Sequence, residues 1–206
     1  MSGTIVLLYN SQVSGNCYKV RLLFAHLGIA YDRETVDVAD RSNRPELLGG
    51  LNPALRVPTI VFDDGRSLGE SGAILWYFAE GTPFVPGDAF ARAQVLQWMF
   101  FEQYELEINI AVVRFWLNYS GLPESAYTGQ LDAKRAGGYK ALDAMERYLA
   151  DGREWFVGDS PTLADLALYG YTHVAHEGGF DMDRYQLIKG WLGRVALMPG
   201  HVPIDA

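Results

Sequence analysis

Four consecutive residues near the N-terminus, Ser14-Gly15-Asn16-Cys17, have the spacing of a C-x-x-C redox motif with serine in place of the first cysteine. A serine hydroxyl is a poor nucleophile unless a base lies beside it. At the start of a helix, however, the hydroxyl can donate a hydrogen bond to a bound anion such as a thiolate. Such a bond contributes roughly 1.5–3 kcal/mol, which would lower the pKa of a bound thiol by roughly one to two units. The residue types indicate either an ordinary N-cap serine or a site that activates a thiol from another molecule.

A second candidate stretch is Asn52–Val61, in which Val57-Pro58 precedes an apolar run typical of a strand. Proline is tolerated as the first residue of a strand. A cis bond at Pro58 would turn the backbone N–H and C=O of Val57 outward, where they could pair with an extended peptide. Only about 5–6% of the bonds before proline are cis, so the residues alone favour a trans bond at the edge of a sheet.

The third candidate is the pair Glu70-Ser71, which opens an apolar segment with helical spacing. Either residue could simply cap that helix. Alternatively, the hydroxyl and N–H of Ser71 could hold a carboxylate while Glu70 holds an amine. The surrounding G-x-S-x-G pattern of serine hydrolases is broken because Ala73 stands where a glycine is required. The pair therefore favours a cap or a binding site over hydrolase chemistry.

The elements that must position these residues follow from the hydrophobic pattern of the first part of the chain. The expected elements are a strand at Thr4–Tyr9, a helix at Ser14–Leu27 ended by Gly28, a strand at Ala30–Val38, a short helix at Arg44–Gly50, a hairpin at Pro58–Leu68 and a helix at Ser71–Ala79. In this order, βαβ-α-ββα, each candidate serine stands where a helix begins.

The composition changes after residue 79. The segment at residues 80–88 is rich in glycine and proline and is typical of a linker. Almost everything after it has helical spacing, with long helices expected at residues 91–119 and 128–150. A further helix begins at Thr162-x-x-Asp165, which is close to a capping box. We therefore expect one domain at residues 1–79 and an all-helical domain at residues 89–206.

Taken in order, these motifs resemble those of the cytosolic glutathione transferases. Ser14 before a helix, Val57-Pro58 before a hairpin, Glu70-Ser71 at the next helix and the capping motif at Thr162 all match, and the resemblance covers essentially the whole chain. It implies a thioredoxin-like N-terminal domain that binds glutathione, followed by a helical-bundle domain that lines the site of an electrophile.

The resemblance implies that Ser14 donates a hydrogen bond to the sulfur of glutathione, as in the serine-type classes of the family. Asn16 is the second candidate for this catalytic contact because its amide could also donate. Tyr9, Ser11 and Cys17 lie in the same loop and remain competitors. Tyr9 has the pattern of strand-end packing, and Cys17 that of a small buried side chain.

The remaining glutathione contacts are also carried over from the resemblance. Val57 is the residue whose backbone pairs with the cysteinyl unit of glutathione, ahead of a cis proline at Pro58. Glu70 and Ser71 hold the γ-glutamyl end. Arg56 stands where related sequences often carry a lysine near the glycyl carboxylate.

Three activities fit this set of residues. The first is transfer of glutathione to a small hydrophobic electrophile, because holding both reactants close makes the addition effectively intramolecular. The second is a glutathione-dependent peroxidase or disulfide reductase on the same fold, in which the thiolate attacks a peroxide or a disulfide and Cys17 could matter. The third is a non-catalytic binding module that has kept the fold, although such a module does not need all of these residues.

Composition excludes several other classes of partner. The chain has 206 residues, a formal net charge of −8 and one cysteine. No cluster of lysine and arginine indicates a nucleic-acid or anionic-membrane partner, and one cysteine excludes an internal disulfide. The first residues lack the features of a signal peptide, and no apolar run reaches about 18 residues. We therefore expect a cytoplasmic protein without a membrane span.

The same reasoning bears on metals and on assembly. His173 and His176 are three residues apart, but no other ligand accompanies them, so we expect no metal cofactor. The family is usually dimeric, and the resemblance therefore implies a homodimer.

Overall fold

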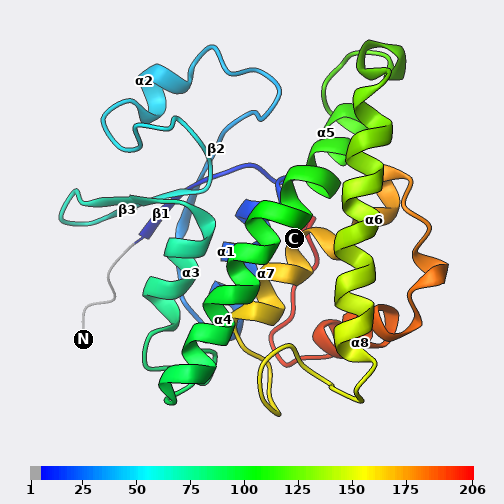
Figure 1. The fold of residues 1–206 in the computed structure, drawn as a ribbon. Coiled ribbons are helices and arrows are strands. Elements are labelled where there is room, and N and C mark those ends of the chain that lie inside the picture. The colour runs from blue at the N-terminus through cyan, green and yellow to red at the C-terminus, as the bar shows by residue number, and fades with distance from the viewer. Residues whose placement is uncertain (1–5) are drawn as a thin grey trace. The chain divides into compact units, whose positions relative to one another are not determined.

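The computed structural model describes residues 6–206, which form two compact units (Figure 1). Among the described residues, unit 1 is residues 6–80 together with Pro199–Ala206, and unit 2 is Gly81–Met198. Unit 1 contains a small mixed sheet with helices and unit 2 is helical, which confirms the predicted fold class of a thioredoxin-like domain followed by a helical one. Thr4 and Ile5, which begin the first predicted strand, lie outside the described residues.

The final segment of the chain corrects one expectation. The predicted helical domain, residues 89–206, included Pro199–Ala206, but this segment groups with unit 1. The physical reason is that side chains of the first helix bind its carbonyl oxygens; the hydroxyl of Tyr18, for example, donates to the carbonyl of Val202 at 2.8 Å. The boundaries of the linker, residues 80–88, stay a prediction.

The sheet of unit 1 has the strand order β2-β1-β3-β4. The strands are β1 (Val6–Asn10), β2 (Asp32–Thr35), β3 (Thr59–Phe62) and β4 (Ser67–Gly69). Strand β1 pairs in parallel with β2 and antiparallel with β3, and β3 pairs antiparallel with β4. The predicted hairpin is confirmed, with Gly65 in its turn at a φ of 83°, which glycine adopts without a side-chain clash. Strand β2 is shorter than the predicted Ala30–Val38, and all of its side chains are exposed.

The helices of unit 1 are α1 (Gly15–Leu27), α2 (Arg44–Leu48) and α3 (Ser71–Ala79). Helix α1 ends at Gly28, as predicted, in the left-handed conformation. Helices α1 and α3 share a buried core with the central strands, formed by Val6, Leu8, Val20, Phe24, Ile60 and Ile74. This core packs both helices against the central strands, and the candidate serines lie where these helices begin.

Unit 2 is built from longer helices. They are α4 (Ala89–Phe101), the π-helix η1 (Glu102–Ala111), α5 (Val112–Asn118), α6 (Gln130–Leu149), α7 (Leu163–Thr172) and α8 (Gln186–Ala196), with short 3₁₀ turns at η2 (Glu124–Tyr127), η3 (Ala175–Gly178) and η4 (Met182–Arg184). The predicted single helix at residues 91–119 is therefore three consecutive segments, and its middle is π-helical. In Figure 1 these segments follow one another in green.

The capping motif of unit 2 is a complete capping box. Thr162 is the N-cap of α7, and the carboxylate of Asp165 accepts a hydrogen bond from the Thr162 N–H at 2.9 Å. The indole of Trp191 on α8 donates to the same carboxylate at 2.9 Å. The box thus connects the start of α7 to α8. Among the described residues, the helices are too short or too polar to cross a membrane.

Candidate functional site

The first predicted site residue, Ser14, is the N-cap of α1. Its backbone is extended, with φ −77° and ψ 119°, and its side-chain oxygen accepts a hydrogen bond from the Cys17 N–H at 3.3 Å. This contact uses a lone pair of the oxygen, so the hydroxyl proton can still be donated to a ligand. The side chain is half-buried. The cap and the ligand-binding role proposed for Ser14 are therefore compatible.

Asn16 connects the starts of the two helices. Its Oδ1 accepts a hydrogen bond from the Oγ of Ser71, at the start of α3, at 3.1 Å. The same oxygen accepts from the ammonium of Lys19 at 2.8 Å. Two residues that the sequence analysis placed in one site, 55 positions apart, are thus in direct contact.

Lys19 was not predicted from the sequence. It lies within α1 and is almost fully buried, at 1% exposure, although lysine is rarely buried without a partner. Because its ammonium donates to Asn16, it places a positive charge beside the start of the helix. In the sequence, its burial could have been suspected only because it stands directly before Val20, which belongs to the apolar stripe of the first helix.

Glu70 and Ser71 begin α3 with an unusual backbone. Glu70 has φ 66° and ψ 116°, a positive φ that a residue with a side chain rarely adopts. Such a conformation costs on the order of 1–3 kcal/mol and is concentrated at functional sites. The side chain of Glu70 is exposed, whereas Ser71 is buried. The strained backbone therefore presents a carboxylate to solvent beside a buried hydroxyl.

The bond between Val57 and Pro58 is cis. The residues alone favoured trans, so that expectation was wrong, and the resemblance implied the observed isomer. The segment before this bond is held by the buried side chain of Asn52, whose Nδ2 donates to the carbonyl of Arg56 at 3.1 Å. The hydroxyl of Thr59 donates to the same carbonyl at 2.7 Å. Side chains on both sides of the bond therefore fix the backbone at Val57.

Arg56 itself is exposed, but it belongs to a group of three arginines. Arg44, the first residue of α2, is buried and donates to the carbonyl of Leu55 at 3.2 Å. Burial lowers the pKa of the Arg44 guanidinium, and the charges of Arg41 and Arg56 lower it further. Among the described residues, Arg44 Nε has no hydrogen-bond acceptor. The group forms a positive region next to the predicted site, and Arg44 was not foreseen.

Cys17 is not placed for redox chemistry. Its side chain is completely buried, and its sulfur accepts a hydrogen bond from the N–H of Ser11 at 3.3 Å. Burial raises the pKa of the Cys17 thiol, although the hydrogen bonds from Ser11 and Ser14 act in the opposite direction. A thiol in this state is mostly protonated at neutral pH and is a weak nucleophile. Which group contacts a bound sulfur stays a prediction.

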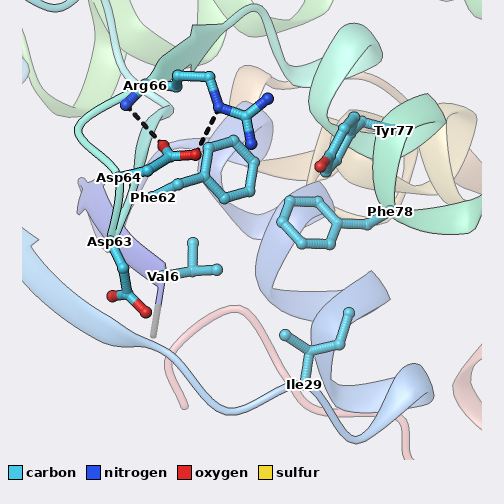
Figure 2. A pocket seen from close by; sticks show the side chains of 8 residues that line it. All are labelled: Val6, Ile29, Phe62, Asp63, Asp64, Arg66, Tyr77 and Phe78. Atoms are coloured by element: carbon cyan, nitrogen blue, oxygen red, sulfur yellow. Dashed lines mark hydrogen bonds and ion pairs between the residues drawn. The ribbon is translucent and has the colours of Figure 1, made fainter. Parts of the chain in front are cut away.

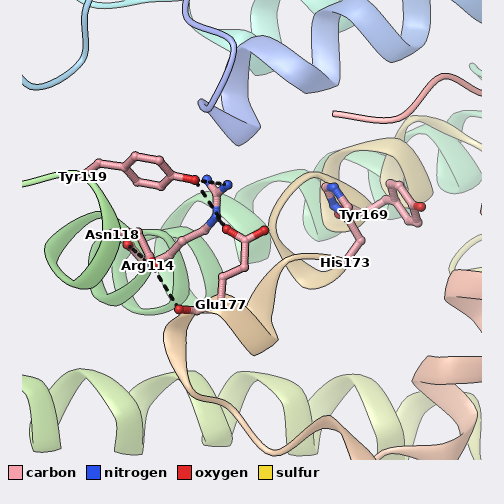
Figure 3. A network of polar contacts seen from close by, with 6 residues as sticks. All are labelled: Arg114, Asn118, Tyr119, Tyr169, His173 and Glu177. Atoms are coloured by element: carbon pink, nitrogen blue, oxygen red, sulfur yellow. Dashed lines mark hydrogen bonds and ion pairs between the residues drawn. The ribbon is translucent and has the colours of Figure 1, made fainter. Parts of the chain in front are cut away.

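Unit 2 contains a separate polar network, shown in Figure 3. The buried guanidinium of Arg114 donates to the carboxylate of Glu177 at 2.8 Å and to the hydroxyl of Tyr119 at 2.9 Å. The amide of Asn118 donates to the backbone carbonyls of Arg114 and Glu177, both at 2.9 Å. These contacts join α5 to the turn η3, so the network stabilises unit 2.

A cavity of about 510 Å³ lies in unit 1 (Figure 2). It combines an aromatic wall with a charged rim, in which Arg66 pairs with Asp64 at 2.7 Å. Its lining is formed by Val6, Ile29, Phe62, Asp63, Asp64, Arg66, Tyr77 and Phe78. None of these described residues belongs to the predicted glutathione contacts, so the cavity is separate from the candidate site. Among the described residues, no group of three potential ligands for a metal ion is present.

Comparison with known proteins gives a consistent result. The family models for the N-terminal and C-terminal domains of glutathione S-transferases match residues 13–80 and 128–194. A solved glutathione S-transferase from Pseudomonas fluorescens Pf-5 is 43% identical, with a TM-score of 0.93 and coverage of 98% of this chain and 99% of that chain.

Two further proteins are more distant. Dichloromethane dehalogenase from Methylorubrum extorquens is 29% identical over 187 residues, which cover 85% of this chain and 64% of the dehalogenase. The structure of Ure2p in complex with glutathione is 22% identical, with a TM-score of 0.83 and coverage of 97% and 92% of the two chains. At that identity the likeness concerns the fold.

Proposed function

Because this chain belongs to the glutathione S-transferase family, we propose that it is an enzyme that binds glutathione on unit 1, ionises its thiol and transfers it to a small hydrophobic electrophile. The observation that carries the proposal is the 3.1 Å hydrogen bond from Ser71 to Asn16. It brings the start of α1, which would meet the sulfur, to the start of α3, which would meet the γ-glutamyl end. One extended tripeptide could then contact both.

Three parts of unit 1 would hold the tripeptide. Ser71 and the carboxylate of Glu70 would bind the γ-glutamyl end, which carries both a carboxylate and an amine. The backbone of Val57, ahead of Pro58, would pair with the cysteinyl unit. Arg56 would attract the glycyl carboxylate, supported by the buried charge of Arg44 behind it. Each end of glutathione would thus meet an opposite charge.

Thiol activation would rest on the start of α1. The hydroxyl of Ser14 would donate to the sulfur, with the amide of Asn16 as the alternative donor, and the free N–H groups of the helix would favour negative charge. The ammonium of Lys19 would add to that preference. The thiol proton would pass to water, and the thiolate would form a bond to the electrophilic carbon while a leaving group departs or a double bond opens.

The electrophile would be small and apolar. A relative named dichloromethane dehalogenase is compatible with a small halogenated substrate. In the alternative, a glutathione-dependent peroxidase or disulfide reductase, a direct part for Cys17 has less support, because that thiol is buried and its pKa is raised. We also propose that the enzyme acts in the cytoplasm as a homodimer.

The ultraviolet absorbance of the thiolate of bound glutathione, followed against pH, tests this function. In the wild type we expect a pKa below the value of about 8.5 for a free thiol. Ser14→Ala should raise it by roughly one to two units, as the loss of a charge-assisted hydrogen bond requires. Ser67→Ala, which removes a hydrogen bond to the carbonyl of Leu51 away from the start of α1, is the matched control and should leave it unchanged.

The other outcomes are informative. If Ser14→Ala leaves the pKa unchanged and Asn16→Ala raises it, the activating group is Asn16. Glutathione that binds without ionising, and without turnover on a panel of electrophiles, would instead indicate a non-catalytic binding module.

A further inference from the structure

The segment Pro199–Ala206 returns to unit 1 and follows helix α1. At its beginning, His26 Nδ1 lies 2.8 Å from the carbonyl oxygen of Pro199. Eight residues earlier on α1, the hydroxyl of Tyr18 donates to the carbonyl of Val202 at 2.8 Å. The segment is therefore held to α1 by side chains of the helix.

The far end of this segment reaches the loop that precedes α1. The carbonyl oxygen of Ile204 accepts hydrogen bonds from Arg21 Nη2 at 2.6 Å and from Gln12 Nε2 at 3.0 Å. Gln12 Nε2 also lies 2.7 Å from the carbonyl oxygen of Ala206. The carbonyl of Ile204 thus connects Arg21, on helix α1, to Gln12, in the loop before it.

Arg21 extends this connection into the loop itself. Its Nη1 donates to Asn10 Oδ1 at 2.6 Å and to the carbonyl of Ser11 at 3.4 Å, and its Nη2 donates to the carbonyl of Gln12 at 3.1 Å. The guanidinium is buried, and the acceptors named here, with Ile204, are neutral oxygen atoms. A buried charge needs such acceptors, and burial lowers the pKa of Arg21. Removing one acceptor should therefore disturb the others.

We propose that residues 203–206, through Arg21 and Gln12, hold the loop Asn10–Ser14 in the shape that places Ser14 for thiol activation. Arg21 is then a positioning residue, since it contacts the loop and not the substrate. The part that concerns thiol activation rests on the proposed function. The part that concerns the shape of the loop does not.

The only cysteine of the chain reports on the loop without any glutathione. Cys17 is buried and accepts a hydrogen bond from Ser11 N–H, inside the loop. If the loop opens, the thiol becomes accessible to a disulfide reagent such as 5,5′-dithiobis(2-nitrobenzoate). Two variants remove the connection, namely a chain that ends at Val202 and the full chain with Gln12→Ala.

We expect both variants to react at least about tenfold faster than the wild type. Ser67→Ala is the matched control, because it removes one hydrogen bond of unit 1, to the carbonyl of Leu51 at 2.6 Å, away from the loop. Its rate should stay within about twofold of the wild type. Repeating the reaction in low urea separates loop opening, which responds weakly to urea, from global unfolding, which responds strongly.

The second measurement is the pKa of the bound glutathione thiol. In both variants it should rise by about one unit while the dissociation constant of glutathione changes less than about threefold, because the other contacts remain. Unchanged labelling, or faster labelling with an unchanged thiol pKa, would overturn the proposal. If the wild type binds no glutathione, the proposed function fails, and the labelling rates alone decide whether the segment holds the loop.

Discussion

At the scale of single residues, Glu70 shows how the fold accepts strain where a ligand would bind. Its φ of 66° is unfavourable for a residue with a Cβ, whereas glycine tolerates positive φ more readily. Glu70→Gly should therefore raise the free energy of unfolding by about 1 kcal/mol. The same change should weaken glutathione binding by about tenfold or more, because a charged contact is lost.

Urea unfolding and calorimetric titration measure these two effects. Glu70→Gln is the matched control, since it keeps the strained backbone and removes only the charge. It should weaken binding without the gain in stability. A glycine variant that loses stability and keeps its affinity would mean that the conformation at Glu70 serves the fold rather than the ligand.

The sequence predicted the positions of those site residues that are determined by the neighbouring strands and helices. Ser14 follows a strand and precedes an apolar helix, so its place as an N-cap could be predicted. Lys19 and Arg44 could not be predicted in the same way, because nothing in the residues around them indicates that a charged side chain is buried there. The cis state of Pro58 likewise depends on its surroundings, and the residues alone favoured the other isomer.

At the scale of the elements, α6 packs closely on η1 because it carries two glycines. A Cβ on Gly138 would lie 2.5 Å from the ring of Phe180 and 3.1 Å from the side chain of Ile110. Gly138→Ala should therefore lower the free energy of unfolding by about 1–3 kcal/mol. Gly193→Ala on α8 is the matched control, since no atom lies within 4 Å of its added Cβ.

The control should raise stability by as much as about 1 kcal/mol, because alanine favours a helix more than glycine does. Thermal unfolding monitored by circular dichroism measures both variants. Equal effects at the two positions would show that close packing at α6 does not contribute.

The capping box of α7 makes a pH-dependent prediction. Burial raises the pKa of Asp165 to about 6, despite the hydrogen bonds that it accepts. In the unfolded chain the value is about 3.9, so between these values the folded state binds more protons. The resulting stabilisation is fully present below pH 4 and is lost as the pH rises through 6.

The free energy of unfolding of the wild type, relative to Asp165→Asn, should therefore decrease by roughly 1–3 kcal/mol between about pH 4 and pH 6. The variant has no titrating group at this position, so other carboxyl groups cancel in the difference. Urea unfolding at several pH values measures it. Two parallel curves would contradict the raised pKa.

The elements also mark where prediction from sequence stops. The apolar spacing of residues 91–119 predicted one helix, because a π-helical segment and an α-helix differ little in composition. The structure replaces the middle of that helix with η1. This segment packs against α6, where Gly137 lies close to Asn109 and Gly138 lies close to Ile110. The apolar spacing of residues 91–119 alone carries no information about packing against α6.

At the scale of the whole molecule, the surface of unit 2 supports the proposed dimer. Three large apolar side chains spaced four residues apart, Phe100, Tyr104 and Ile108, are exposed along α4 and η1. Phe100 is 68% exposed and Tyr104 is 71% exposed. Exposed apolar side chains that recur along one helix mark an interface more often than isolated ones do. If the proposed homodimer forms, this stripe of Phe100, Tyr104 and Ile108 would contact the second copy of the chain.

Placing a charge on this surface should prevent association. With a net charge of −8 on each chain, two copies already repel each other. A carboxylate added inside the contact would also lose its hydration, which costs further free energy. Phe100→Glu should convert a species of twice the chain mass into one of the chain mass, as measured by light scattering after gel filtration. Leu197→Glu is the matched control, because Leu197 is 85% exposed and lies outside the stripe. A wild type that elutes as a monomer, or a Phe100→Glu variant that remains dimeric, would remove this surface from the proposed interface and leave glutathione binding by unit 1 unaffected.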